Sequence, residues 1–265
     1  MEEVFAHCDT ITVMRDGYAI SSKPTRETNM EQVVRDMVGR SITEYYPGRT
    51  NEPGEIVLEV KNFCQEGLFN NISFKLRKGE ILGVAGLMGA GRTEIMRALF
   101  GVDSCKHGEV YLHGKKVCIK KPEDAIKAGI GFITENRKSE GLILDFSISR
   151  NIALPSVDTF AKRSVINAKN ETAFSEALSK KLGVKTASID LEAGALSGGN
   201  QQKVVIAKWI GMNPSIIIMD EPTRGIDVGA KRDIYDLMNE LTSQGVAIIM
   251  VSSELPEVIG MSDRI

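Results

Sequence analysis

The stretch EILGVAGLMGAGRTEIMRALF, residues 80–100, decides the fold class. Its opening EILGVAG is an apolar run that ends in glycine, which is typical of a buried parallel strand. Its closing TEIMRALF has the spacing of an amphipathic helix. The part between them resembles a phosphate-binding loop of the pattern G-x-x-x-x-G-K-[ST]. Gly86, Gly91 and Thr93 match this pattern, but Arg92 stands where lysine is usual.

A strand that runs through such a loop into a helix directs backbone N–H groups and the positive end of the helix dipole at one point. That geometry suits a phosphate, and we expect the hydroxyl of Thr93 to bind Mg²⁺. Arg92 keeps the positive charge of lysine but carries it on a wide planar fork instead of a compact ammonium. A chance run of glycines remains an alternative interpretation of this stretch taken alone.

Composition narrows the class of protein. The chain has 265 residues, of which 42% are hydrophobic and 26% charged, as in an ordinary globular protein. Its net charge of −2 argues against nucleic acid as the main partner. We find no run of about 18 apolar residues that would span a membrane, and no signal-peptide core at the start. The 4 cysteines form no C-x-x-C pair, which favours free thiols.

Strand and helix signals alternate from about residue 55 onward. The segments EIVLEV, ISFKL, IGFIT, SIIIMD and VAIIMVSS are predicted strands, and EVYLHGKKVCI is a predicted hairpin that turns at His113 and Gly114. Residues 142–212 are predicted to be mainly helical. This alternation indicates a three-layer α/β architecture with a mostly parallel sheet.

The two ends of the chain resemble each other. MEEVFAHCDTI (1–11) and LPEVIGMSDRI (255–265) match at four aligned positions. The match is explained either by two similar helix-to-strand turns or by a repeated unit. On the second interpretation, residues 1–50 are the tail of a preceding unit and a linker, with YYPGRTNEPGE as linker composition. Residues 51–265 are then the main domain, cut short at its C-terminal end.

A second stretch, SIIIMDEPTRGID, brings two acids to the end of a buried strand. Ligands of α/β sheets bind at the carboxyl ends of the strands. We expect Asp220 to hold Mg²⁺ and Glu221 to act as general base toward a water molecule. The alternative is an ordinary helix cap, where aspartate is also common.

A third stretch, LSGGNQQ, places Ser197, Gly198 and Gly199 at the start of a predicted helix. They leave N–H groups open to an anion, although a simple N-cap followed by flexible glycines has the same pattern. In this order the three stretches resemble the ATP-binding cassette ATPases, and LSGGNQQ resembles their signature motif.

The resemblance extends to a narrower group. GLMGAGRTE, ITENRKSEGL, LSGGNQQK, DEPTRGIDVGAK and VSSELPEV are together similar to the second cassette of tandem monosaccharide importers of the ribose, galactose and xylose type. The resemblance implies a P-loop NTPase fold with a RecA-like parallel sheet, an antiparallel β subdomain and a helical signature subdomain at about residues 142–205. Residues 1–50 resemble the end of a first cassette.

The resemblance also implies site residues. The phosphate loop and first helical turn match Gly86, Gly89, Ala90, Gly91, Arg92, Thr93 and Glu94, and the signature matches Ser197, Gly198, Gly199 and Asn200. Asp220 and Glu221 match the metal-binding and catalytic acids, and Asp227 matches an acid that faces the opposite cassette.

Besides Arg92, two further positions depart from the family pattern. Glu135 stands where a metal-approaching glutamine is usual, and Ser253 stands where a histidine is usual near the γ-phosphate. Serine cannot hold a proton near pH 7 as histidine does. For stacking on adenine we prefer Phe63 to Phe69, because Phe69 continues into a strand pattern.

ATP and Mg²⁺ are the implied cofactors, and the implied function is an ATPase that powers monosaccharide import. The implied partners are a first cassette of the same parent chain, a membrane permease contacted near Glu135 and residues 141–160, and indirectly a sugar-binding protein. The implied location is the cytoplasmic face of the membrane. We expect two unequal nucleotide sites, with the signature acting in trans and the Arg92 site slow or inactive. A cassette protein acting on ribosomes or DNA, and a regulatory module without turnover, remain alternatives.

Overall fold

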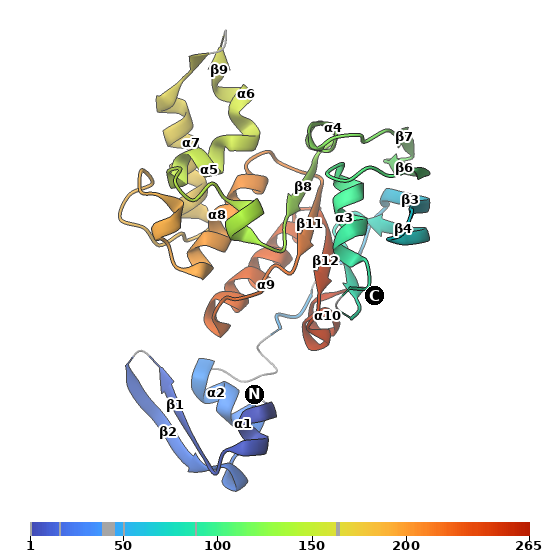
Figure 1. Ribbon diagram of the computed structural model, residues 1–265. Helices are drawn as coiled ribbons and strands as arrows, with labels where there is room; N and C mark the ends of the chain where they lie inside the picture. The colour runs from blue at the N-terminus through green and yellow to red at the C-terminus, as the bar shows by residue number, and fades with distance from the viewer. Residues whose placement is uncertain (1, 16, 39–45, 50, 88, 163–164) are drawn as a thin grey trace.

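The computed structural model describes residues 2–15, 17–38, 46–49, 51–87, 89–162 and 165–265. Within these residues a parallel sheet lies at the centre of the molecule (Figure 1). Its strands follow the order β5 (Ile81–Ala85), β12 (Ala247–Ser252), β11 (Ile216–Asp220) and β8 (Ile130–Ile133). The predicted parallel sheet is therefore confirmed.

The register of the sheet aligns the ends of its strands. Ala85 of β5 pairs with Ser252 of β12, and Val251 of β12 pairs with Asp220 of β11. Because parallel strands present their carboxyl ends at one edge, the segments that follow these residues meet there.

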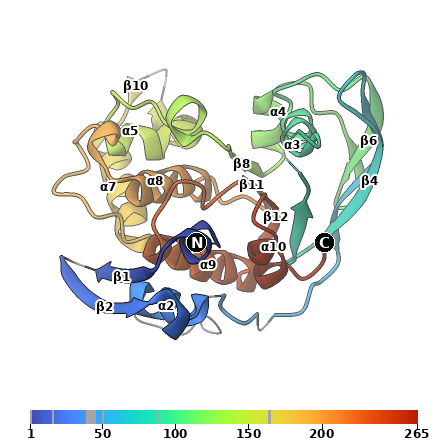
Figure 2. The same cartoon turned by 60° about the horizontal axis from the view of Figure 1, so that its bottom comes forward.

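Helices cover both faces of the sheet, which explains why its strands are continuously apolar. Ile216, Ile217, Ile218 and Met219 have no exposed surface. Helix α3 (Arg92–Phe100) lies on one side, and α9 (Val228–Ser243) and α10 (Leu255–Met261) lie on the other (Figure 2). Helix α10 comes so close to β5 that a Cβ atom at Gly83 would lie 2.7 Å from a methyl of Val258.

An antiparallel sheet flanks the central one, in the order β4 (Phe69–Arg77), β3 (Ile56–Gln65), β6 (His107–Leu112) and β7 (Lys115–Val117). Strands β6 and β7 are joined by His113 and Gly114, with φ angles of 48° and 75°. These angles belong to a tight hairpin turn, so the predicted hairpin is confirmed. Helix α4 (Pro122–Lys127) then leads to β8.

The middle of the chain is helical, as predicted. It contains α5 (Ile148–Ala153), α6 (Val157–Phe160), α7 (Ala168–Lys181) and α8 (Gly198–Ile210), with the short 3₁₀ helices η4 (Leu154–Ser156) and η5 (Ala193–Ala195). The short π-helix η3 (Arg137–Gly141) precedes them. The antiparallel pairing of β9 (Ala161–Lys162) with β10 (Val165–Ile166) was not predicted, because strands of two residues carry no readable alternation. No helix in the described ranges has the length and apolar character needed to cross a bilayer.

The N-terminal segment folds as a separate small unit (Figure 1). It consists of α1 (Glu2–His7), β1 (Thr10–Arg15), β2 (Tyr18–Pro24), η1 (Thr25–Glu27) and α2 (Met30–Val38). Its own core joins Ile11, Val13 and Val33. Both similar ends of the chain are a helix followed by an extended segment, since α10 is followed by Arg264, which bridges to Leu82 in parallel. This geometry fits both interpretations of the similarity.

The linker predicted from Tyr45 to Glu55 lies partly outside the described residues, which exclude Tyr45 and Thr50. Its described part is attached to the main domain. The side-chain amide of Asn239 donates to the carbonyl of Pro47 at 3.1 Å, and Arg49 forms an ion pair with Asp263 at 2.6 Å.

Candidate functional site

A cavity of ≈ 260 Å³ opens where the central strands end. The loop and first helical turn at Gly89–Glu94 line it, together with Glu135, Glu221, Arg224 and Ser253. Each strand of the central sheet supplies or leads into part of this lining. All of these residues except Arg224 are predicted from the sequence.

The loop has the backbone geometry that its glycines predict. Gly89 and Gly91 have φ angles of 79° and 83°, a region that glycine adopts without a steric penalty. Helix α3 begins at Arg92 with no side-chain cap on its first turn. The free N–H groups of that turn therefore remain available to an anion in the cavity.

Arg92 lines the cavity, but its guanidinium is bound by neighbouring groups of the protein. Its side chain folds back over Gly86, where a Cβ atom would lie 3.4 Å from Cδ of Arg92. Its Nη1 donates to the carbonyl of Ser252 at 2.7 Å, and its Nη2 lies 3.8 Å from Oε1 of Glu221. The side chain is only 12% exposed, so the wide guanidinium is packed against the sheet edge.

Asp220 lies beneath the cavity at the end of β11 and has no exposed surface. Both of its carboxylate oxygens are buried without a hydrogen-bond partner among the described residues. Burial raises the pKa of this carboxyl to about 6, although the nearby hydroxyl of Thr93 lowers it in part. The two buried carboxylate oxygens of Asp220 are suitable ligands for a hard cation such as Mg²⁺, which would satisfy them.

Glu221 follows directly and has a φ of 49°, which is unusual for a residue with a side chain. Its Oε2 accepts a hydrogen bond from the hydroxyl of Ser253 at 3.2 Å. Burial raises the pKa of Glu221, while Ser253 and Arg92 oppose that rise. The turn therefore directs a carboxylate of raised basicity into the cavity, and Ser253 orients it.

Glu135 enters the cavity from the segment after β8, and it forms an ion pair with Arg224. The backbone of Arg224 is fixed by Arg137, whose Nη1 and Nη2 donate to the carbonyls of Arg224 and Gly225 at 2.8 and 3.1 Å. Arg224 was not predicted from the sequence. The only signal for it is a basic residue close after the paired acids in EPTRGID.

A buried carboxylate on α10 was likewise not predicted from the sequence. Glu257 of α10 is 1% exposed and accepts hydrogen bonds from the hydroxyls of Thr223 at 2.6 Å and Tyr235 at 2.9 Å. It also accepts from the hydroxyl of Ser252. Glu257 thus connects the segment after β11, which contains Glu221 and Thr223, to the end of β12, where Ser252 precedes Ser253.

The signature residues do not line the loop cavity. Ser197 is exposed and precedes α8, whose first turn has no side-chain cap. The side-chain amide of Asn200 forms hydrogen bonds within the protein. Its Nδ2 donates to Oγ of Ser197 at 3.0 Å, and its Oδ1 accepts from the backbone N–H of Lys185 at 2.8 Å. Gly198 packs close to Arg137.

Gly199 and Asp227 lie beside each other on the same side of the molecule. A Cβ atom at Gly199 would lie 2.8 Å from that of Ala230, so only glycine fits there. Oδ1 of Asp227 accepts from the backbone of Ala230 at 2.9 Å and caps α9. Asp227 is exposed, and the structure gives it the role of a helix cap.

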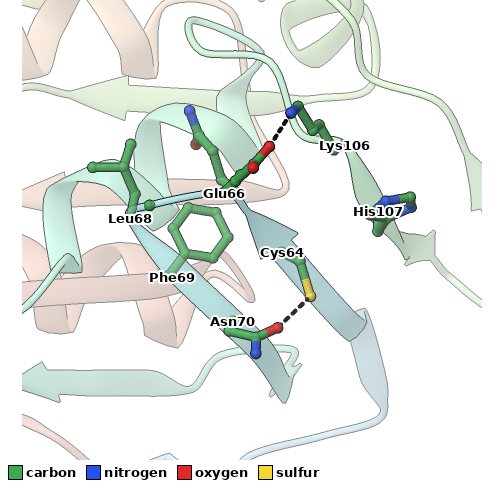
Figure 3. Close-up of a pocket in the computed structure, with 9 residues that line it drawn as sticks. Cys64, Glu66, Leu68, Phe69, Asn70, Lys106 and His107 are labelled. Carbon is green, nitrogen blue, oxygen red and sulfur yellow. Dashed lines mark hydrogen bonds and ion pairs between the residues drawn. The ribbon is translucent and has the colours of Figure 1, made fainter.

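The expectation that Phe63 stacks on a base needs correction. Phe63 is 4% exposed and belongs to the core, so it offers no free ring face. Phe69 is half-buried, stacks on Phe63 with a centroid distance of 5.6 Å, and lines a second cavity of ≈ 700 Å³ (Figure 3). That cavity adjoins the loop, because the carbonyl of Leu68 would lie 3.3 Å from a Cβ atom at Gly91.

Figure 3 shows how the second cavity is formed at the turn between β3 and β4. The ring of Phe69 lies beside Leu68, and Glu66 forms an ion pair with Lys106 at the rim. An apolar surface with polar groups at its edge is the usual environment for a planar organic ring.

Comparison with known proteins agrees with this geometry. The family described as "ABC transporter" matches residues 69–224. Ribose import ATP-binding protein RbsA of Bacillus subtilis (strain 168) is 61% identical over the whole chain, which covers 54% of that relative. The protein of the same name from Oceanobacillus iheyensis is 60% identical, also over the whole chain, which covers 53% of it. The chain thus spans about half the length of the curated relatives it matches.

Solved structures show the same fold. The ATP-binding cassette MJ1267 in its ADP conformation has a TM-score of 0.65 at 23% identity, covering 78% of this chain and 85% of that one. The dimeric cassette MJ0796 has a TM-score of 0.66 at 22% identity, covering 78% of this chain and 91% of that one. The predicted α/β class is confirmed, and the chain belongs to the ABC transporter family.

Proposed function

We propose that this chain binds ATP with Mg²⁺ and hydrolyses it to power the import of a monosaccharide of the ribose type. The observation that carries the proposal is the single cavity into which the glycine loop, Glu221 and Ser253 converge from three adjacent strands. The names of the relatives support ribose import as the process.

The nucleotide is placed by two neighbouring cavities. The N–H groups of the loop and of the first turn of α3 bind the phosphates. Phe69, at the adjoining cavity, supplies the ring face for the base. The hydroxyl of Thr93 and the carboxylate of Asp220 hold the metal ion, which fits the unpartnered buried oxygens of Asp220. When bound, Mg²⁺ supplies neutralisation of charge on the phosphate oxygens.

Glu221 then acts as the general base. Its raised pKa brings it closer to the operating pH, where a base is most effective. Ser253 holds one carboxylate oxygen, which leaves the other to accept the proton of the attacking water. Arg92 lies near that second oxygen and limits its basicity, because a nearby cation favours the charged form.

The signature residues Ser197–Gly199 serve a second nucleotide held by a neighbouring cassette. Their absence from the lining of the loop cavity supports this division of roles. We take the neighbour to be a first cassette of the same parent chain, in which case the N-terminal unit up to residue 50 is its last part. The other partners are a membrane permease, approached near Glu135 and residues 141–160, and indirectly, through the permease, a sugar-binding protein. The chain itself works at the cytoplasmic face of the membrane.

A second candidate function is a regulatory module that binds nucleotide without turnover. It is favoured by the turned-back side chain of Arg92 and by Ser253 in place of the usual histidine. Both candidates bind ATP, but only the first hydrolyses it.

The test is to purify the complete parent protein with its permease and measure ATP hydrolysis with and without sugar-loaded binding protein. We expect hydrolysis that rises when the loaded binding protein is added. ATP binding to the loop cavity together with a hydrolysis rate that Glu221→Gln leaves unchanged supports the regulatory module instead. Failure to bind ATP refutes both candidates.

A further inference from the structure

The charges around the loop cavity are poorly balanced for an anionic ligand. Glu94, Glu135 and Glu221 line it with carboxylates, whereas Arg92 and Arg224 are its lining cations among the described residues. A nucleotide adds more negative charge to this site. The affinity of the site for a nucleotide therefore depends on where the guanidinium groups of Arg92 and Arg224 lie.

The guanidinium of Arg92 already has partners within the protein. It binds the carbonyl of Ser252 and lies beside Glu221, and only 12% of the side chain is exposed. Turning it toward a phosphate would leave a buried carbonyl without a donor, which is costly. Arg92 is thus a poor candidate for recognising the end of a phosphate chain.

Arg224 is placed differently. Its side chain is 57% exposed, and within the described part of the chain Glu135 is the group that its guanidinium contacts. An exposed ion pair of this kind contributes little stability. A phosphate offers the guanidinium fork a stronger, bidentate partner. The guanidinium of Arg224 is therefore expected to exchange the carboxylate of Glu135 for a phosphate when one is present.

The backbone of Arg224 is nevertheless held in place. The guanidinium of Arg137 grips the carbonyls of Arg224 and Gly225, so the point of attachment stays at the mouth of the cavity. A fixed backbone with an exchangeable side chain is the arrangement expected of a group that changes partner when a ligand arrives.

We propose that Arg224 recognises the terminal phosphate of a nucleoside triphosphate in the loop cavity, and that Glu135 holds it there until the nucleotide binds. This inference rests on the proposed nucleotide-binding function. In the triphosphate complex the guanidinium leaves Glu135 for phosphate oxygens, and Glu135 becomes free to approach the metal ion. A diphosphate leaves the ion pair intact, so Arg224 makes the site prefer triphosphate.

The test compares affinities for ATP and ADP, each with Mg²⁺, by displacement of a fluorescent nucleotide from the full chain. Arg224→Ala is expected to weaken ATP binding at least about tenfold and ADP binding less than about twofold, because only ATP loses a charged hydrogen-bond partner. Arg224→Lys is expected to fall between, since it keeps the charge without the fork.

Lys138→Ala is the matched control. Lys138 is an exposed cation that lines a neighbouring cavity with Glu135 and Arg137, but not the loop cavity. Its removal deletes the same charge and is expected to leave both affinities unchanged. If Arg224→Ala does not fold, as judged by circular dichroism, Arg224→Gln gives the same comparison with a longer side chain.

The outcomes separate this inference from the function on which it rests. Equal losses for ATP and ADP, or no loss for either, overturn the role of Arg224 while nucleotide binding stands. Equal effects of Arg224→Ala and Lys138→Ala also overturn it, because the effect is then one of general charge. A wild-type chain that binds neither nucleotide refutes the proposed function itself.

Discussion

The guanidinium of Arg92 lies 3.8 Å from the carboxylate of Glu221, measured from Nη2 to Oε1. The residue at the lysine position of the loop therefore faces the proposed general base instead of the phosphates. Because a nearby cation stabilises the ionised carboxylate, Arg92 restrains the rise in the pKa of Glu221 that burial causes. The site therefore has a general base, Glu221, whose basicity is reduced by Arg92, and it lacks the lysine that usually contacts the phosphates.

Arg92→Lys is expected to strengthen binding of ATP with Mg²⁺ by about tenfold, the effect of adding a charged hydrogen bond. A compact ammonium lacks the fork that holds Ser252 and can lie within the loop. Equilibrium titration with a fluorescent nucleotide measures the change, with Arg92→Met as the variant that lacks any charge. Unchanged or weaker binding by Arg92→Lys would mean that Arg92 already serves the phosphates.

The affinity for Mg²⁺ in the presence of ATP is expected to fall as the pH drops below about 6. The pKa of Asp220 is raised from 3.8 to about 6, so this carboxyl is ionised above that pH and neutral below it. Only the ionised form binds the cation, and the affinity then falls by up to about tenfold per pH unit. Titration of Mg²⁺ from pH 8 to pH 5 measures the profile.

Asp220→Asn controls for the protonation of ATP itself, which is the same for both proteins. The variant is expected to bind Mg²⁺ weakly at every pH and to lack the extra loss in acid. If the two proteins show parallel pH profiles, Asp220 is not the ligand.

Glu257→Ala is expected to lower the free energy of unfolding by about 3 kcal/mol, because the hydroxyls of Thr223, Tyr235 and Ser252 lose a buried acceptor. Glu257→Gln keeps one acceptor oxygen and is expected to cost about 1 kcal/mol. Urea unfolding of both variants provides the measurement. Two variants that are both as stable as the wild-type chain would show that the network around Glu257 contributes nothing.

Phe69→Ala is expected to weaken ATP binding by about tenfold or more, the loss typical of removing an aromatic ring that stacks on a base. Phe69→Tyr keeps the ring and is expected to bind normally. Phe63→Leu is the contrasting variant: it lowers stability, because Phe63 lies in the core, and leaves affinity unchanged. The prediction fails if Phe63→Leu reduces affinity more than Phe69→Ala does.

The parallel sheet and the glycine loop are predictable from the sequence because their signals are local. The strand that ends at Asp220 is a continuous apolar run, and the turn at Gly91 needs a residue that tolerates positive φ. The order of the strands brings Glu221 and Ser253 together, as expected of a sheet whose strands end at one edge.

The choice between Phe63 and Phe69 was not predictable in the same way. Alternation assigns faces only while the strand is regular, and β3 shifts register on both sides of Phe63. Asn62, just before it, has a φ of 48°, which marks the irregularity. The bulge turns Phe63 into the core, against the face that simple alternation assigns to it.

The partners of the two arginines were beyond reach for another reason. Arg92 binds a carbonyl 160 residues away, and Arg224 pairs with an acid 89 residues away. No periodicity in the sequence encodes such contacts, which arise only when separate strands of the sheet come to the same edge.

The central claim is that the signature residues and the loop cavity of this chain serve two different nucleotides. Only the nucleotide that the signature residues contact is hydrolysed rapidly. ATP hydrolysis by the complete parent protein with its permease tests it most directly, comparing Ser197→Arg with Glu221→Gln. We expect Ser197→Arg to reduce the rate by about a hundredfold, since it blocks the anion-binding N–H groups of the faster site. We expect Glu221→Gln to leave about half of the rate or more. Equal losses in the two variants would contradict the account.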